Sequence, residues 1–105
     1  MEINISDEEC PLRKMLEIIG GKWTMLIIFQ INQRTLRYGE LKRSIVGISE
    51  KMLIGQLKLL GEKGIVHKKS FPEIPPKVEY TLTDTGKELL PIIHQIIQFS
   101  IHHKM

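Results

Sequence analysis

Two lysines and a glycine between residues 50 and 60 have the spacing that contact with a polyanion requires. If ISEKMLIGQLKLLGEKG (48–64) is helical, Lys51 and Lys58 lie two turns apart, opposite an apolar face formed by Leu53, Leu57 and Leu60. Ammonium groups placed in this way can reach phosphates or base edges. Gly55 lies between them and lowers helix stability by about 1 kcal/mol relative to alanine. A glycine at position 55 would be explained if the helix backbone must approach a large ligand closely. The alternatives are close packing or drift at Gly55 and a solvated surface for the lysines.

The charge of the chain is concentrated in its middle. The formal net charge is only +3, and the first ten residues contain four acidic residues and no lysine or arginine. From Arg34 to Lys77 there are ten lysines and arginines and four glutamates. A basic middle is expected of a protein that binds nucleic acid, although an ordinary solvated surface can have the same composition.

Cys10 is the one cysteine, so no disulfide can form within the chain and a four-thiolate zinc site is excluded. It lies at the start of a predicted helix, where the helix dipole and the nearby Arg13 and Lys14 favour the thiolate, while the acidic residues before it oppose this effect. An accessible thiolate beside a dimer surface would suit a sensor of oxidants or electrophiles. The alternative is a small, half-buried residue that packs beside the neighbouring helix.

The sequence gives little support to other chemistries. It contains no glycine-rich phosphate loop, no G-x-S-x-G motif and no convincing Cys–His or paired-carboxylate arrangement, so we predict no enzymatic activity and no cofactor. The four histidines lack the spacing of ligands on one helix face, and no metal site is expected. No apolar run reaches about 18 residues and no signal-peptide pattern occurs, which predicts a cytoplasmic protein that does not enter the membrane.

Two helices are expected in the first third of the chain. Pro11 suits a first helical turn, and PLRKMLEII (11–19) has apolar residues at helical spacing until Gly20 and Gly21 interrupt it. KWTMLIIFQI (22–31) is almost wholly apolar, which predicts a buried central helix. Residues 1–9 are expected to form a flexible acidic terminus.

Residues 38–63 have the pattern of a helix-turn-helix. A short helix is expected over YGELKRSI (38–45), followed by a tight turn at Val46 and Gly47. Ser49 is suited to cap the next helix, because its hydroxyl can accept a hydrogen bond from a free backbone N–H one turn later. Gly64 is suited to end that helix. Two helices joined by a short turn that contains glycine fit the motif.

Residues 65–82 are expected to form a β-hairpin directly after the helix-turn-helix. Val78, Tyr80 and Leu82 alternate with polar residues, as in a strand with one buried face. The tip contains adjacent prolines, which fix φ and favour a stiff, extended connection. With lysines at 68, 69 and 77, this hairpin resembles the wing of a winged helix.

The predicted DNA contacts come from the first helix of the motif, the exposed face of the second helix, and the wing. They are Arg37, Lys42, Arg43, Ser49, Lys51, Ile54, Gly55, Lys58, Lys68 and Lys77. Glu40 lies among these cations and is expected either to orient Arg37 or Arg43 or to be simply solvated.

The segment 84–103 is expected to form a helix that is capped by Thr83 and kinked at Pro91. Its apolar residues cover more than one face, which is more than a small domain can bury, so a partner helix is implied. Together with the helix at 10–20, this segment predicts a homodimer. The expected interface residues are Leu12, Leu16, Ile93, Ile96, Ile97 and Ile101.

A set of motifs occurs in a fixed order over roughly residues 10–98. They are Cys10-Pro11, IGGKWTMLII (19–28), RYGEL (37–41), GIS (47–49), PPKVEYTLT (75–83) and Gly86. Together they resemble the HxlR family of bacterial transcriptional regulators. The resemblance implies a dimeric winged helix-turn-helix protein with an architecture related to the MarR group, in which the terminal helices form the dimer and one long helix per subunit enters the major groove.

The resemblance also concerns Cys10, which occupies the place of a cysteine through which some members sense thiol-reactive electrophiles or oxidants. The chain departs from the family pattern on the long helix, where Ile54 and Gly55 stand in place of the usual threonine and a larger polar residue. Lys68 stands where arginine is common, which keeps the charge and loses the bidentate geometry. These departures affect which operator sequence is recognised.

The sequence therefore predicts one domain, mainly α-helical with a small β-hairpin, that has a winged helix-turn-helix fold and dimerises through its N- and C-terminal helices. The predicted function is a homodimeric transcriptional regulator that binds a pseudo-palindromic operator in double-stranded DNA. Three alternatives remain for the signal that controls it: thiol modification at Cys10, a small ligand bound between the dimer helices, or no signal at all. The alternative function is a winged-helix module that binds proteins and not DNA.

Overall fold

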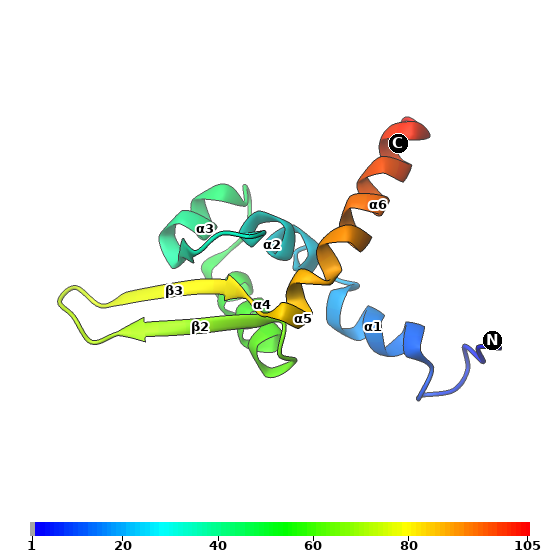
Figure 1. Ribbon diagram of the computed structural model, residues 1–105, viewed down its shortest axis with the longest axis horizontal. Coiled ribbons are helices and arrows are strands. Elements are labelled where there is room, and N and C mark those ends of the chain that lie inside the picture. The colour runs from blue at the N-terminus through cyan, green and yellow to red at the C-terminus, as the bar shows by residue number, and fades with distance from the viewer. Residues whose placement is uncertain (1) are drawn as a thin grey trace.

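The computed structural model of the protein describes residues 2–105 and contains, within that range, six helices and three strands (Figure 1). In chain order they are α1 (Pro11–Ile19), α2 (Thr24–Ile31), β1 (Leu36–Arg37), α3 (Tyr38–Ser44), α4 (Glu50–Glu62), β2 (Val66–Phe71), β3 (Lys77–Leu82), α5 (Asp84–Lys87) and α6 (Leu89–His102). The prediction of a mainly α-helical winged helix-turn-helix with a small β-hairpin is confirmed.

The core is built around α2. Its residues Ile27, Ile28 and Ile31 are completely buried and pack in one cluster with side chains from α3, α4, the sheet and α6. The predicted central helix is thus confirmed, although it begins at Thr24 and is not buried on every side, because Leu26 remains 49% exposed.

Local chemistry sets the ends of α4 as the sequence indicates. The Ser49 Oγ accepts a hydrogen bond from the backbone N–H of Met52 at 3.0 Å. Gly64 has a φ of +71° after the last helical turn, a conformation that glycine adopts without strain. The N–H of Ile65 then donates to the carbonyl of Leu60 at 2.9 Å, which closes the helix in a Schellman arrangement.

The three strands form an antiparallel sheet in the order β1-β3-β2. Val66, Tyr80 and Leu82 point into the core, and the β2–β3 hairpin extends well beyond the helical body (Figure 1). The hairpin is as predicted, but its tip is not an extended connection. The chain bends at Ile74 and Pro75, and the Ile74 side chain is fully exposed.

The C-terminal segment is two helices and not one helix kinked at Pro91. The break lies at Glu88, between α5 and α6, and Pro91 is in the first turn of α6. Proline cannot donate to the carbonyl four residues earlier, and its ring collides with that carbonyl, so a continuous helix through Lys87 and Pro91 is disfavoured. In a first turn the missing N–H has no cost.

The helix α6 carries two apolar stripes. Leu90 and Ile93 are buried and Ile97 packs against them, whereas Ile92, Ile96 and Phe99 form a second stripe whose residues are 47–57% exposed. We call the second set the α6 stripe. Both α1 and α6 project from the body (Figure 1), and none of the α1 residues is buried.

Gly86 is the position in α5 where the fold admits no side chain. A Cβ atom placed there would lie 2.1 Å from the carbonyl oxygen of Ile65. We therefore expect Gly86→Ala to lower the free energy of unfolding by about 1–3 kcal/mol, the usual cost of overpacking. Gly55→Ala is the matched control, since nothing lies within 4 Å of its Cβ position, and it should raise stability by about 1 kcal/mol. Urea unfolding measures both, and equal stability of the two variants would contradict the expectation.

Candidate nucleic-acid interface

The outer face of α4 matches the face expected from the sequence. Lys51, Gly55 and Lys58 are exposed, and Ile54 beside them is 52% exposed. The open space around Gly55 excludes close packing within residues 2–105 as the reason for this glycine. The face therefore combines two cations with a point where the helix backbone is uncovered.

Ser49 contributes to this surface by capping α4, so that the N-terminal end of the helix lies at the surface. Its side chain is exposed, but its oxygen already accepts the hydrogen bond that caps α4. The free N–H groups of the first turn and the positive end of the helix dipole lie beside it, where an anion is favoured.

A groove of about 540 Å³ separates α4 from the hairpin. Its floor is apolar, and Lys58 of α4 and Lys68 of β2 both line it. Lys68 faces this groove because it lies opposite Tyr80 in the sheet and shares the inward face of that residue. The lining residues are Ile54, Leu57, Lys58, Gly61, Glu62, Val66, Lys68 and Tyr80.

Lys77 lies on the other face of the sheet. Its Nζ is 3.4 Å from a carboxylate oxygen of Glu79 and 4.6 Å from the centre of the Phe71 ring, and its side chain is only 24% exposed. Glu79 also lies opposite Arg37 of β1 and Lys69 of β2. The sheet register thus places Arg37, Lys69 and Lys77 on the face of the sheet that carries Glu79, with Lys77 paired to its carboxylate. Lys68 is the wing lysine that lines the groove against α4.

Glu40 acts on the backbone beside Arg37. Its Oε1 accepts a hydrogen bond from the Arg37 N–H at 2.8 Å, which stabilises the start of α3. Lys42 and Arg43 lie in the last turn of α3, and the Arg43 guanidinium lies next to Gly39. Arg43 is exposed and Lys42 is half-buried.

No sequence pattern predicts a special role for Tyr38, but its hydroxyl is enclosed and has no hydrogen-bond partner among residues 2–105. Burial raises the pKa of Tyr38, and the carboxylate of Glu50 at the start of α4 raises it further. Burial also raises the pKa of Tyr80, with a smaller effect from Tyr38. Both phenols therefore stay neutral between the sheet and the start of α4.

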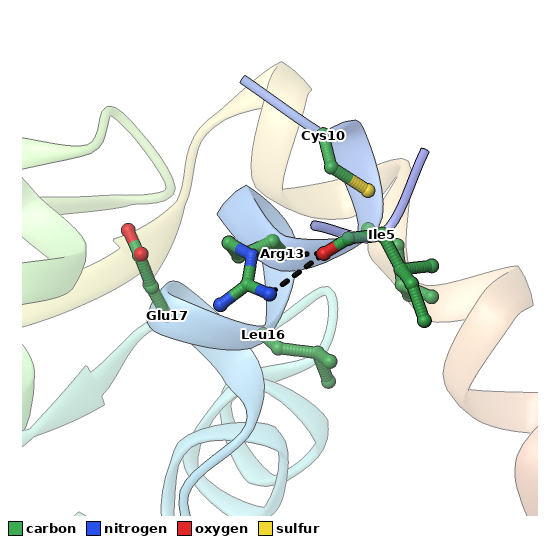
Figure 2. Close-up of a pocket in the computed structure, with 6 residues that line it drawn as sticks. Ile5, Cys10, Arg13, Leu16 and Glu17 are labelled. Carbon is green, nitrogen blue, oxygen red and sulfur yellow. Dashed lines mark hydrogen bonds between the residues drawn. The ribbon is translucent and has the colours of Figure 1, made fainter. Parts of the chain in front are cut away.

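Cys10 is buried, which corrects the expectation of an accessible thiol. It is 4% exposed, and Figure 2 shows its sulfur directed toward the side of Ile5. Arg13 donates from Nε and Nη2 to the Ile5 carbonyl at 3.2 and 2.6 Å, so the segment before α1 lies against this helix. A mostly apolar pocket of about 480 Å³ opens beside the thiol, lined also by Leu12, Leu16 and Glu17.

The expected interface residues divide into two groups. Leu12 and Leu16 of α1 are each 56% exposed, and Ile96 and Ile101 of α6 are 47% and 65% exposed. Ile93, at 6%, belongs to the core of the chain itself, and Ile97 packs partly against that core, because both lie on the inner face of α6. The α6 stripe adds Ile92 and Phe99, which the list from the sequence lacks.

Two further residues escaped the sequence patterns because they depend on distant partners. Thr24, at 1% exposure, donates from its hydroxyl to Oε1 of Gln56 at 2.7 Å. Glu79 looks like one polar residue of an alternating strand until the register places it opposite Arg37 and Lys69. The one signal in the sequence that could have drawn attention to Thr24 is its position as a polar residue within the apolar run 22–31.

Residues 2–105 contain neither a cluster of metal-binding side chains nor a membrane-spanning helix. No group of three or more histidine, cysteine, aspartate and glutamate side chains lies close enough together to hold a metal ion. None of the described helices combines the length and apolarity needed to cross a membrane.

Comparison with known proteins agrees with the geometry. The family model described as HxlR-like helix-turn-helix matches residues 18–105. An uncharacterised HTH-type transcriptional regulator of Halalkalibacterium halodurans is 41% identical over 98 residues, which cover 92% of this chain and 87% of the relative.

Two solved structures are also similar. The crystal structure of a MarR-family transcriptional regulator from Porphyromonas gingivalis W83 has a TM-score of 0.88 and 62% identity, and the match covers 93% of this chain and 96% of the other. The redox regulator HypR in its oxidised form has a TM-score of 0.82 and 36% identity, covering 89% and 96%. With its winged helix-turn-helix and basic α4 face, this chain belongs to the HxlR-like helix-turn-helix family of DNA-binding transcriptional regulators.

Proposed function

We propose that the protein is a cytoplasmic homodimer that regulates transcription by placing one α4 helix of each subunit in successive major grooves of a pseudo-palindromic operator. The observation that carries this proposal is the exposed α4 face, with Lys51 and Lys58 on either side of an uncovered Gly55. Two-fold related helices of this kind bind half-sites about 34 Å apart. The expected base-edge contacts come from this face, and its two lysines are also expected to contact phosphates.

Phosphate contacts would come from three places around α4. Lys68 shares the groove with Lys58, Arg43 extends from α3, and Arg37 lies at the edge of the sheet. Arg43 and Arg37 would lie over the DNA backbone that flanks the major groove. Contacts of this kind position the protein without selecting a sequence.

A winged helix that binds only proteins is the alternative function. Such a module is expected to present an apolar or acidic face on its long helix, whereas the exposed side of α4 carries lysines. This charge favours the DNA-binding function.

The exposed surface of α1 and α6 supports the homodimer. The α6 stripe, Leu12 and Leu16 leave five large apolar side chains about half exposed on two helices that project from the body. Because each of these side chains is already about half covered, burying the rest of it contributes about 0.8–1.5 kcal/mol. A second copy of the same surface would cover this area in a two-fold arrangement.

Thiol chemistry at Cys10 is the trigger that the comparisons favour, since HypR, a structural relative, is described as a redox regulator. The thiol of this chain is buried beside the segment that Arg13 holds through Ile5, so movement of that segment would open it further to an oxidant or electrophile. A small ligand between the dimer helices, or no trigger, remains as the alternative.

The first prediction from this proposal concerns Lys58. The wild-type protein should bind random duplex DNA at low salt, and Lys58→Ala should weaken this binding and reduce the slope of log K against log salt. Two lost phosphate contacts per dimer reduce the slope by roughly 2. Lys77→Ala is the matched control and should change the slope less, because Glu79 already neutralises that half-buried ammonium. A gel shift over a salt series measures both, and absence of duplex binding at low salt would favour the protein-binding alternative.

Our second prediction concerns the dimer. Ile96→Asp places a carboxylate in the α6 stripe, and each dimer would bury two such groups without a partner, so the variant should be monomeric by light scattering at micromolar concentration. It should retain the helical circular dichroism of the wild type, because Ile96 is 47% exposed in the single chain. Ile74→Asp, at the fully exposed wing tip, should stay dimeric. A dimeric Ile96→Asp protein would refute this interface.

Our third prediction concerns Cys10. An oxidant such as diamide should release wild-type protein from DNA, and Cys10→Ser should stay bound under the same treatment. Arg13→Ala should speed the reaction of the thiol with a disulfide reagent, because it frees the segment that covers Cys10. If Cys10→Ser is released like the wild type, Cys10 is not the trigger.

A further inference from the structure

Thr24 is a buried polar residue in an otherwise apolar segment. It begins α2, is 1% exposed, and is followed by the apolar side chains that form the core. Its hydroxyl donates to Oε1 of Gln56, 32 residues away on α4, at 2.7 Å. A buried hydroxyl without a partner destabilises the folded state, so this hydrogen bond fixes which side chain of α4 faces Thr24.

Gln56 lies on the flank of α4, between its core face and its exposed face. At 100° per residue, Gln56 is about 60° from Leu53 around the helix axis, while Gly55 and Lys58 are about 140–160° from Leu53. On the opposite flank, Ile54 and Gly61 line the groove against the hairpin. The helix is therefore fixed by a hydrogen bond to α2 on one flank and bordered by the wing on the other.

The buried contacts of Leu53, Leu57 and Leu60 decide which face of α4 points inward, but they set its rotation only coarsely, since apolar burial is not directional. Rotating the helix by about 20° moves a side-chain atom that is roughly 6 Å from its axis by about 2 Å. Such a movement is larger than the range of distances over which a hydrogen bond to a base edge forms.

We propose that Thr24 is a positioning residue for DNA recognition, and that its hydrogen bond to Gln56 sets the rotation of α4 and thereby the sequence specificity of the protein. This inference rests on the proposed function, because specificity presupposes that α4 contacts bases. Thr24 itself touches no DNA in this scheme. Its effect reaches the bases through Gln56 and the α4 backbone.

The test compares Thr24→Val, which has the shape of threonine but no hydroxyl, with Thr24→Ser, which keeps the hydroxyl. Affinity is measured for a duplex selected by the wild-type protein from a randomised pool and for a scrambled duplex of equal length. We expect Thr24→Val to lower the ratio of the two affinities about tenfold, as expected for the loss of one base contact. Scrambled-duplex affinity should not change, and Thr24→Ser should resemble the wild type.

A second variant covers the case in which Thr24→Val does not fold. Gln56→Leu removes the other partner from a half-exposed position and should lower the same ratio. An unchanged ratio in a variant whose melting temperature falls would make the hydrogen bond an ordinary core interaction and overturn the proposal.

A measurement without DNA separates this inference from the proposed function. Residual dipolar couplings of backbone amides report the orientation of α4 relative to α2 in the free protein. We expect α4 to reorient in Thr24→Val and not in Thr24→Ser. If the wild-type protein binds no duplex, the proposed function fails, and the couplings still show whether this hydrogen bond positions α4. Identical couplings in all three proteins would refute the positioning role.

Discussion

Burial of the inner face of α2 is the interaction on which the rest of the structure depends. Ile27, Ile28 and Ile31 lose all contact with water, and the leucines of α4 pack into the same cluster. Because the apolar face of α4 must point inward, its lysines and Gly55 must point outward. The functional surface is thus a consequence of where the core lies, and directional interactions such as the Ser49 cap and the Thr24–Gln56 hydrogen bond then fix the position of the helix.

The same constraint explains the terminal helices. One stripe of α6 completes the core through Leu90 and Ile93, and the other stripe stays exposed because a domain of this size has no further element to cover it. A single helix therefore contributes both to the core beneath α4 and to the surface proposed for dimerisation. A change in the arrangement of the two subunits of the proposed dimer would therefore act on α6, which packs directly against α2.

Charge on the wing is partly balanced within the protein. Lys77 is paired with Glu79 on the sheet face that also carries Arg37 and Lys69, and both lysines lie over the Phe71 ring. This arrangement orders long side chains that would otherwise lose conformational freedom on binding, but it reduces the charge available to a phosphate. Lys68, on the opposite face and beside Lys58, keeps its charge free for that purpose in the described structure.

The sequence by itself determined most of the helices, the two strands of the hairpin, the caps at Ser49 and Thr83, the turn glycines and the exposed basic face of α4, because periodicity and capping are local properties. It did not determine the inward position of Ile93, the cover over Cys10, the break before Pro91, the pairing of Lys77 with Glu79 or the partner of Thr24. Each of these depends on contacts between elements or on the register of strands. A pattern along one segment shows which faces are apolar, and only the assembled chain decides what lies against each face.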